Sequence, residues 1–300
     1  MTPSTIQAPP QSLRRRLLAT LYRHPRLQVL LLLAPPTGWF GLVYLGSLAL
    51  LFVAAFWYLD PLTSAIKHDL TLKNFQTLLT NPVYRTITFR TVGMAALVTV
   101  LDALLAFPVA YFMARYAGVR TRALMFILVM LPLWSSYLVR VYAWRVILGP
   151  GGPFEWTMAQ VGIPNVVLYP SDLAIPIVFT YIWLPYMILP IYAGLERLPS
   201  SLLEASGDLG ARPWMTFRKV VLPLVFPAVV AGSIFTFSLT LGDYITPGLV
   251  SNTQFIGNVI YDSQGVAGNV PFAAAYATAP VLIMAVYLIV ARKLGAFDAL

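Results

Sequence analysis

Long apolar segments with few charges alternate with short polar segments along this chain. The apolar segments predict membrane-spanning helices over residues 37–59, 91–114, 123–148, 173–195, 220–242 and 272–291. Each is long enough to cross the hydrocarbon core of a bilayer, which takes about 20 helical residues. We therefore expect an all-α membrane protein with six transmembrane helices.

The segment before the first predicted span is interrupted by Pro35 and Pro36. Proline lacks the amide N–H that a helix interior needs, so we begin the first span after this pair. Residues 1–36 are then a tail followed by an interfacial lead-in, with a short surface helix expected over Leu13–Tyr22. Residues 37–300 are expected to form one transmembrane domain.

A short amphipathic helix is predicted between the first two spans. Its apolar residues recur at helical spacing and share one face: Leu72, Phe75, Leu78 and Leu79. Asn81-Pro82 is expected to end it, because a residue before proline is pushed out of the helical conformation.

Composition excludes several other classes of protein. The chain is 59% hydrophobic and only 10% charged, which is too little charge to cover a soluble surface. It has no cysteine and two histidines, so disulfides, thiolate metal sites and multi-histidine metal centres are not expected.

The net charge of +9 predicts orientation in the membrane rather than a nucleic-acid partner. Fourteen of the 20 Lys and Arg residues fall in the tail, in residues 115–122 and 197–219, and at 292–293. Basic residues collect on the cytoplasmic side, so both termini are expected there. The first apolar segment is too long for the core of a cleavable signal peptide, so we expect a retained anchor.

The most informative polar segment is 196–223. Ser201 and Glu204 have the spacing of a capping box at a helix start. Gly210 can adopt the left-handed conformation that ends a helix, and Pro213 suits the first turn of the next one. Trp214, Met215 and Phe217 supply apolar contacts. They suit either a cleft on a partner protein or the surface of the bilayer, and the residues alone leave both open.

This segment resembles a motif of the permeases of binding-protein-dependent ABC importers. The matching residues keep the family's spacing: Glu204, Ala205, Ser206, Gly210, Val220, Leu222 and Pro223. Two differ from the family's pattern, since Ser206 replaces alanine and Val220 replaces isoleucine. The resemblance implies that this segment is the coupling helix, which docks on an ATPase through Glu204, Ala205, Ser206, Gly210, Trp214 and Phe217.

Three further segments resemble the spermidine/putrescine branch, most of all its first permease subunit: residues 131–144, 184–190 and 241–247. Systems for opines, other amino compounds and ferric iron share much of this pattern. The resemblance implies a type I importer permease of the cell inner membrane. It would form half of the translocation pathway for a small cationic or amino-containing solute such as a polyamine. Its implied partners are a second permease, two ATP-binding subunits and an extracytoplasmic binding protein.

The chain has no phosphate-binding pattern G-x-x-x-x-G-K-[ST], because no glycine is followed by lysine. ATP and Mg²⁺ are therefore expected on a partner ATPase, with no cofactor or metal on this chain, which is not expected to be an enzyme.

An ion-gradient-driven transporter is the alternative, but it should show inverted repeats and paired ionisable residues. A membrane enzyme should show a cluster of His, Asp or Glu at one membrane face.

Candidate pathway residues are the ionisable and aromatic side chains in or beside the spans. Asp102, in the middle of a span, is either a cation contact or an acid that packs against a neighbouring helix or is protonated. Arg140 and Arg145 are expected to face protein or water. Asp243 and Tyr244 end the fifth span, where a carboxylate and an aromatic face could hold an ammonium group. Trp183 and Tyr186 could do the same or belong to an interfacial belt.

Overall fold

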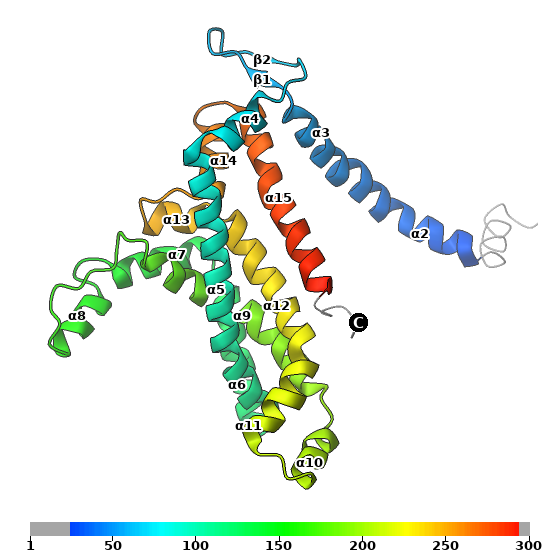
Figure 1. Ribbon diagram of the computed structural model, residues 1–300, viewed down its shortest axis with the longest axis vertical. Coiled ribbons are helices and arrows are strands. Elements are labelled where there is room, and N and C mark those ends of the chain that lie inside the picture. The colour runs from blue at the N-terminus through cyan, green and yellow to red at the C-terminus, as the bar shows by residue number, and fades with distance from the viewer. Residues whose placement is uncertain (1–24, 294–300) are drawn as a thin grey trace, which may run out of the picture. The chain divides into compact units, whose positions relative to one another are not determined.

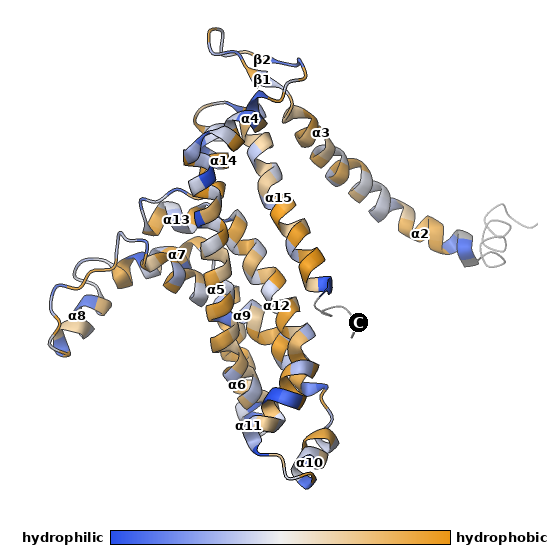
Figure 2. Cartoon of the chain, viewed as in Figure 1, coloured by the Kyte–Doolittle hydropathy of each residue, from blue (hydrophilic) through white to orange (hydrophobic). Residues whose placement is uncertain are grey.

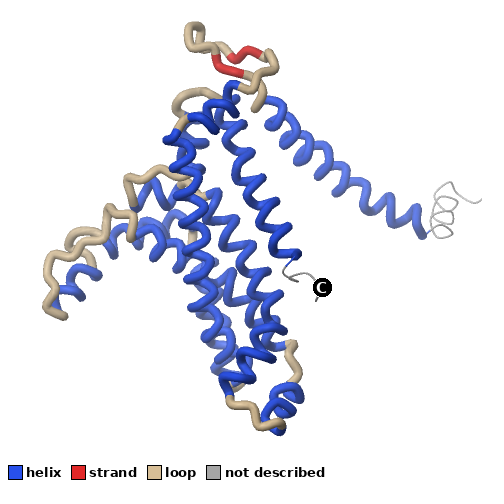
Figure 3. The backbone as a smooth tube through the Cα atoms, viewed as in Figure 1, coloured by secondary structure: helices blue, strands red, loops and turns tan. Residues whose placement is uncertain are grey.

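The computed structural model describes residues 25–293, so the helix predicted at Leu13–Tyr22 lies outside the described residues. The chain divides after Val53 into two parts, and each is described by itself. Figure 1 labels the elements, and Figure 3 marks the loops that connect them.

The first part is one helical run: α2 (Pro25–Trp39), the π-helical turn η1 (Phe40–Leu45) and α3 (Gly46–Ala54). A candidate span in this region is confirmed, but its predicted bounds of 37–59 are wrong, because the apolar helix runs from Gln28 to Ala54. Both prolines lie inside α2, since their fixed φ is compatible with a helix and membrane helices tolerate the missing N–H.

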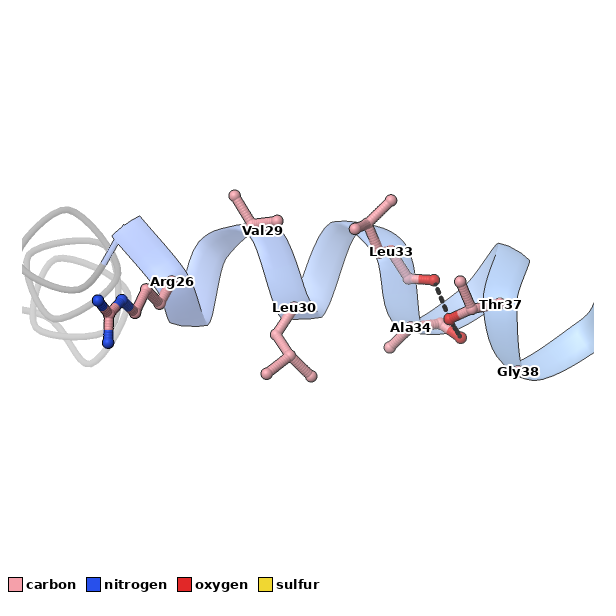
Figure 4. Close-up of a pocket in the computed structure, with 7 residues that line it drawn as sticks. All are labelled: Arg26, Val29, Leu30, Leu33, Ala34, Thr37 and Gly38. Carbon is pink, nitrogen blue, oxygen red and sulfur yellow. Dashed lines mark hydrogen bonds between the residues drawn. The ribbon is translucent and has the colours of Figure 1, made fainter. Parts of the chain in front are cut away.

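The helix surface at α2 is almost entirely apolar. Figure 4 shows Val29, Leu30 and Leu33 projecting from it, and the hydroxyl of Thr37 donating to the Leu33 carbonyl oxygen at 2.5 Å. Each of these three apolar side chains is more than half exposed. This composition suits a helix surrounded by lipid or by another membrane protein.

The second part begins with a two-stranded antiparallel hairpin, β1 (Tyr58–Leu59) with β2 (Ile66–Lys67). These are the strands found among residues 25–293, and the rest of the regular structure there is helical. The amphipathic helix is confirmed as α4 (Lys73–Thr80). Its buried Asn74 donates to the carbonyl oxygens of Ala55 and Trp57, which fixes the hairpin to the helix. Leu72 and Leu79, expected on the apolar face, are both exposed.

Four long helices carry the membrane domain: α5 (Pro82–Arg115), α9 (Ala174–Glu196), α12 (Leu222–Gly242) and α15 (Val270–Lys293). The spans predicted at 173–195, 220–242 and 272–291 are confirmed within a few residues. Helix α5 begins nine residues before the predicted 91, because Asn81 accepts a hydrogen bond from the Val83 amide and Pro82 occupies the first turn. Figure 2 shows hydrophobic residues along most of α12 and α15.

Helices α5, α9 and α12 form the core of the membrane domain. Small residues bring their backbones close together, as is common between membrane helices. A methyl group on Gly194 of α9 would lie 2.6 Å from the Cβ of Ala228 on α12. One on Gly232 would lie 2.7 Å from the sulfur of Met187. Substituting either glycine would force α9 and α12 apart.

The third predicted span is broken. Residues 119–160 form α6 (Val119–Trp134), α7 (Tyr137–Leu148) and α8 (Pro153–Gln160), with a bend of 96° after Trp134. Ser135 ends α6, since both its amide and its hydroxyl donate to the Pro132 carbonyl oxygen and its backbone is extended. Within the described residues five helices are long and apolar enough to span a membrane, and the bent pair makes a sixth if it counts as one span.

Two short helices follow α12: α13 (Ile245–Val250) and α14 (Ile256–Gly265). Gly257 lies so close to the end of α12 that a methyl group there would be 2.7 Å from the Asp243 carbonyl oxygen. The Ile256 amide donates to the Thr91 hydroxyl at 3.1 Å. This pair of helices is therefore fixed against both α12 and α5.

The 196–223 segment contains α10 (Ser200–Asp208), α11 (Pro213–Thr216) and the π-helical turn η2 (Phe217–Val221), which leads into α12. Arg115, at the end of α5, donates to the carbonyl oxygens of Leu195 and Leu198 at 2.8 and 2.7 Å. These bonds fix the point where α9 ends and the segment begins.

Candidate functional site

The 196–223 segment is built around a glycine turn. Gly210 has a φ of +74°, which confirms the predicted left-handed conformation. The Ala211 amide donates to the Ser206 carbonyl oxygen at 3.1 Å, and the Gly210 amide to that of Gly207 at 2.8 Å. This pair of bonds is the Schellman motif, which satisfies the last carbonyls of α10. Gly210 therefore sets the angle between α10 and α11.

The capping box predicted from Ser201 and Glu204 is wrong. Helix α10 begins after Pro199, which makes no side-chain capping bond, so Ser201 is already its second residue. Pro199 occupies the N-cap position with an extended backbone, two residues before the predicted cap Ser201, so Ser201 lies inside the helix and cannot cap its start. Glu204 and Ala205 are instead both exposed, where another protein can reach them.

Ser206 and the aromatic residues connect the segment internally. The hydroxyls of Ser206 and Thr216 hydrogen bond at 2.8 Å and join α10 to α11, a contact that the family's alanine could not make. Phe217 stacks on Trp214 at 5.4 Å and packs edge-on against Phe107 of α5 at 5.3 Å. Phe217 thus anchors the segment to this chain's own core, while Trp214 is 69% exposed and free to contact a partner.

The opposite end of the spans holds a cluster that we name the Tyr137 cluster: Tyr137, Arg140, Trp183, Tyr186, Asp243 and Thr246. Asp243 accepts hydrogen bonds from the amides of Ile245 and Thr246 at 2.7 and 2.9 Å, and so caps α13. The Tyr137 hydroxyl donates to its other carboxylate oxygen and lies 2.6 Å from the Thr246 hydroxyl. Three neutral donors therefore hold this carboxylate.

Two of the predicted aromatic residues belong to the same cluster. Trp183 is buried and stacks on Tyr137 at 5.8 Å, while Tyr186 lies edge-on to Trp183 at 5.9 Å. Asp243, Trp183 and Tyr186 thus come together around Tyr137, 106 residues before Asp243 in the chain. Tyr137 falls within residues 131–144, but the sequence alone does not distinguish it as a candidate pathway residue.

Tyr244 and Asp102 lie outside this cluster's hydrogen bonds. Tyr244 is partly exposed and stacks on Tyr261 at 4.6 Å. Asp102 is fully buried in α5, and neither of its carboxylate oxygens has a hydrogen-bond partner among residues 25–293. One turn away, the Thr99 and Thr236 hydroxyls join α5 to α12 at 3.4 Å.

Arg140 and Arg145 differ in their surroundings. Arg140 is only 9% exposed, its guanidinium lies 5.8 Å from the centre of the Tyr137 ring, and its Nε and Nη1 have no partner in the described part of the chain. Arg145 lies over Tyr169 at 4.9 Å. Neither makes a salt bridge among residues 25–293.

A further carboxylate holds the loop between α13 and α14. Asp172 accepts hydrogen bonds from the hydroxyls of Thr253 and Ser251, the latter at 2.7 Å. These bonds hold the pKa of the Asp172 carboxyl below its usual range. No local sequence pattern indicates this contact, because the partners are about 80 residues apart.

Close packing of apolar helices through small residues, together with an exposed helix–glycine–helix segment between two spans, is typical of a membrane protein subunit that contacts another protein. Residues 106–296 match the family described as "binding-protein-dependent transport system inner membrane component". The chain belongs to this family and is an ABC importer permease, a multi-pass protein of the inner membrane.

Two relatives agree with this. The chain is 46% identical over 314 residues to the inner membrane ABC transporter permease protein YdcU of Escherichia coli (strain K12), with all of both chains covered. It is 31% identical over 225 residues to the spermidine/putrescine transport system permease protein PotB of Haemophilus influenzae, covering 74% of this chain and 78% of that one. It is a transport subunit and not an enzyme, and the ion-gradient-driven and membrane-enzyme alternatives are not favoured.

The fold agrees as well. The structure is similar to a chain of the bacterial alginate ABC transporter in complex with alginate pentasaccharide-bound periplasmic protein, with a TM-score of 0.71. The match covers 92% of this chain and 96% of that one at 16% sequence identity. The all-α importer permease fold predicted from the sequence is therefore confirmed, with five to six candidate membrane helices in the described residues.

Proposed function

We propose that this chain pairs with a second permease to import a small cationic amino compound, with a polyamine as the first candidate. Two ATP-binding subunits drive the pair, and an extracytoplasmic binding protein delivers the solute. Both termini and the 196–223 segment lie in the cytoplasm, and the Tyr137 cluster lies at the outer end of the pathway. The chain itself holds no ATP and no metal ion.

The observation that carries the coupling role is the exposed Gly210 turn. It supports a rigid two-helix unit that presents Glu204, Ala205 and Trp214 outward while Phe217 connects it to α5. Movement of a docked ATPase subunit would pass through Phe217 and η2 into α12. That helix packs on α9 and α5, so a change at the segment can reach the Tyr137 cluster.

The relationship to a spermidine/putrescine permease supports the polyamine. The Tyr137 cluster adds a chemical reason, because it combines the Asp243 carboxylate with the aromatic ring of the partly buried Tyr186, which packs against Trp183. A carboxylate and aromatic faces are the groups that bind alkylammonium ions. Tyr244 and Asp102 are further candidate contacts along the pathway.

The test is uptake by the complete transporter in vesicles. The two permeases, the ATPase and the binding protein are purified together, and ATP-dependent accumulation of radiolabelled spermidine and putrescine is measured. The expected result is uptake that requires both ATP and the binding protein and is blocked by unlabelled polyamine. Competition by opines or ferric iron instead, with no polyamine uptake, would reassign the solute.

Asp243→Asn tests the pathway residue. Asparagine can still accept from the amides of residues 245 and 246, so α13 stays capped while the charge is lost. We expect cation uptake to fall by about tenfold, equivalent to about 1.4 kcal/mol, with normal assembly of the complex. Asp262→Asn, the same change at another acid beyond the fifth span, is the matched control. Unchanged uptake in Asp243→Asn would remove this residue from the pathway.

A further inference from the structure

The Tyr137 cluster holds a buried cation that has no counter-ion. Arg140 is nine-tenths buried, and two of its guanidinium nitrogens have no hydrogen-bond partner among residues 25–293. A buried guanidinium without an acceptor is costly, because its hydration is lost and not replaced. The Trp183 ring nitrogen and the Thr180 hydroxyl, both on α9, are likewise buried without hydrogen-bond partners in this part of the chain.

The same cluster holds a carboxylate that has no cation. Asp243 accepts only from neutral groups, namely two backbone amides and the Tyr137 hydroxyl. No Lys, Arg or His nitrogen in the described residues lies within salt-bridge distance of it. The buried Arg140 guanidinium and the partly buried Asp243 carboxylate therefore remain unpaired in this conformation.

Tyr137 connects the two charges. Its hydroxyl contacts Asp243, and its ring faces the Arg140 guanidinium. Tyr137 and Arg140 are three residues apart on α7, so they are neighbours on one helix surface. A small rotation of α7, or release of α13 from it, would exchange Tyr137 for Arg140 as the partner of Asp243.

We infer that Arg140 competes with the cationic solute for Asp243, forming an ion pair with that carboxylate when the solute leaves. This inference rests on the proposed function, because it takes the solute to be an ammonium compound that contacts Asp243. In the solute-accepting state Asp243 is held by Tyr137 and is open to an ammonium group. In the releasing state the guanidinium takes the carboxylate and displaces the solute. Arg140 is thus a positioning residue that makes release favourable.

The experiment is putrescine uptake by the complete reconstituted transporter, with KM and kcat measured separately. Arg140→Gln removes the competing charge. The KM for putrescine should then fall several-fold, because the solute is held more tightly. The kcat should also fall, because release of the solute slows. Arg140→Lys keeps the charge and should restore much of kcat. Arg145→Gln is the matched control on the same helix, and both constants should stay within about twofold of the wild type.

Epistasis separates this role from a structural one. With Asp243→Asn already present, Arg140→Gln should have little further effect on either constant, since the competition needs the carboxylate. An unchanged KM in Arg140→Gln would overturn the inference. So would a double variant in which Arg140→Gln changes KM and kcat as much as it does in the wild-type background. If Arg140→Gln does not assemble, the double variant Arg140→Gln with Asp243→Asn, which removes both charges and keeps the cap of α13, should assemble, and its failure would equally overturn the pairing. A wild-type transporter without putrescine uptake would instead refute the proposed solute.

Discussion

Replacement of Gly210 by alanine tests how the 196–223 segment transmits movement. At a φ of +74° a Cβ atom is strained, although no neighbouring atom lies within 4 Å of it. The left-handed conformation costs an L-residue about 1–2 kcal/mol, so the Schellman turn should be less populated by about 5- to 30-fold. Because the turn sets the direction of α11, Trp214 would leave its docking position.

Gly207→Ala provides the matched control. It adds the same methyl group to the same helix, also in open space, but at a position without a positive φ. Alanine in a helix interior is favourable by about 0.5–1 kcal/mol relative to glycine, so this variant should fold at least as well as the wild type.

Two measurements are needed: retention of the ATPase on pull-down and substrate-stimulated ATP hydrolysis in vesicles. We expect Gly210→Ala to reduce ATPase retention by about the factor that the strain predicts, and Gly210→Val to reduce it further, with both proteins still in the membrane. Glu204→Lys should also weaken retention, since its side chain is exposed on α10. Equal losses of ATPase retention in Gly207→Ala and Gly210→Ala would show that the added methyl group, and not the backbone strain, is responsible. Normal ATPase retention and normal stimulated hydrolysis in Gly210→Val and Glu204→Lys would refute the coupling assignment.

Three further predictions concern topology and the packing beyond α12. Reporter fusions after Arg212 should show a cytoplasmic location and one after Gly152 an external one; a cytoplasmic signal at Gly152 would overturn the proposed orientation. Gly257→Ala should destabilise the purified protein in a thermal assay, by about 1–3 kcal/mol, because its methyl would overlap backbone, whereas Gly265→Ala meets open space and should not. The folded-state pKa of Asp172 is lowered, so its contribution is present above the unfolded value of about 3.9 and is lost as the pH falls through the folded value. Hydrogen exchange of the α13–α14 loop should therefore increase in acid, and Asp172→Asn should remove that dependence.

Several features followed from local sequence alone. The uncharged runs that became α9 and α15 needed no tertiary information, because burial in lipid requires about 20 apolar residues whatever the neighbours are. Gly210 was also predictable, since only glycine adopts a positive φ without strain. The spacing around that glycine was enough to indicate the family.

Other features were decided by contacts between distant segments. The first helix continues through Pro35 and Pro36, whereas α6 ends at Ser135, three residues after Pro132. A proline alone therefore does not determine whether a helix continues or ends. The choice depends on which groups satisfy the freed carbonyls and on how the neighbouring helices pack.

The Tyr137 cluster could not be predicted, because its members come from α7, α9, the end of α12 and α13. The sequence identified Asp243 and Trp183 as candidates, but only the fold brings Tyr137 between them. Only the fold also leaves Arg140 buried without a counter-ion. Side-chain partners across helices depend on helix rotation and separation, which are fixed by close contacts such as that of Gly232 with Met187 and not by the periodicity of either helix.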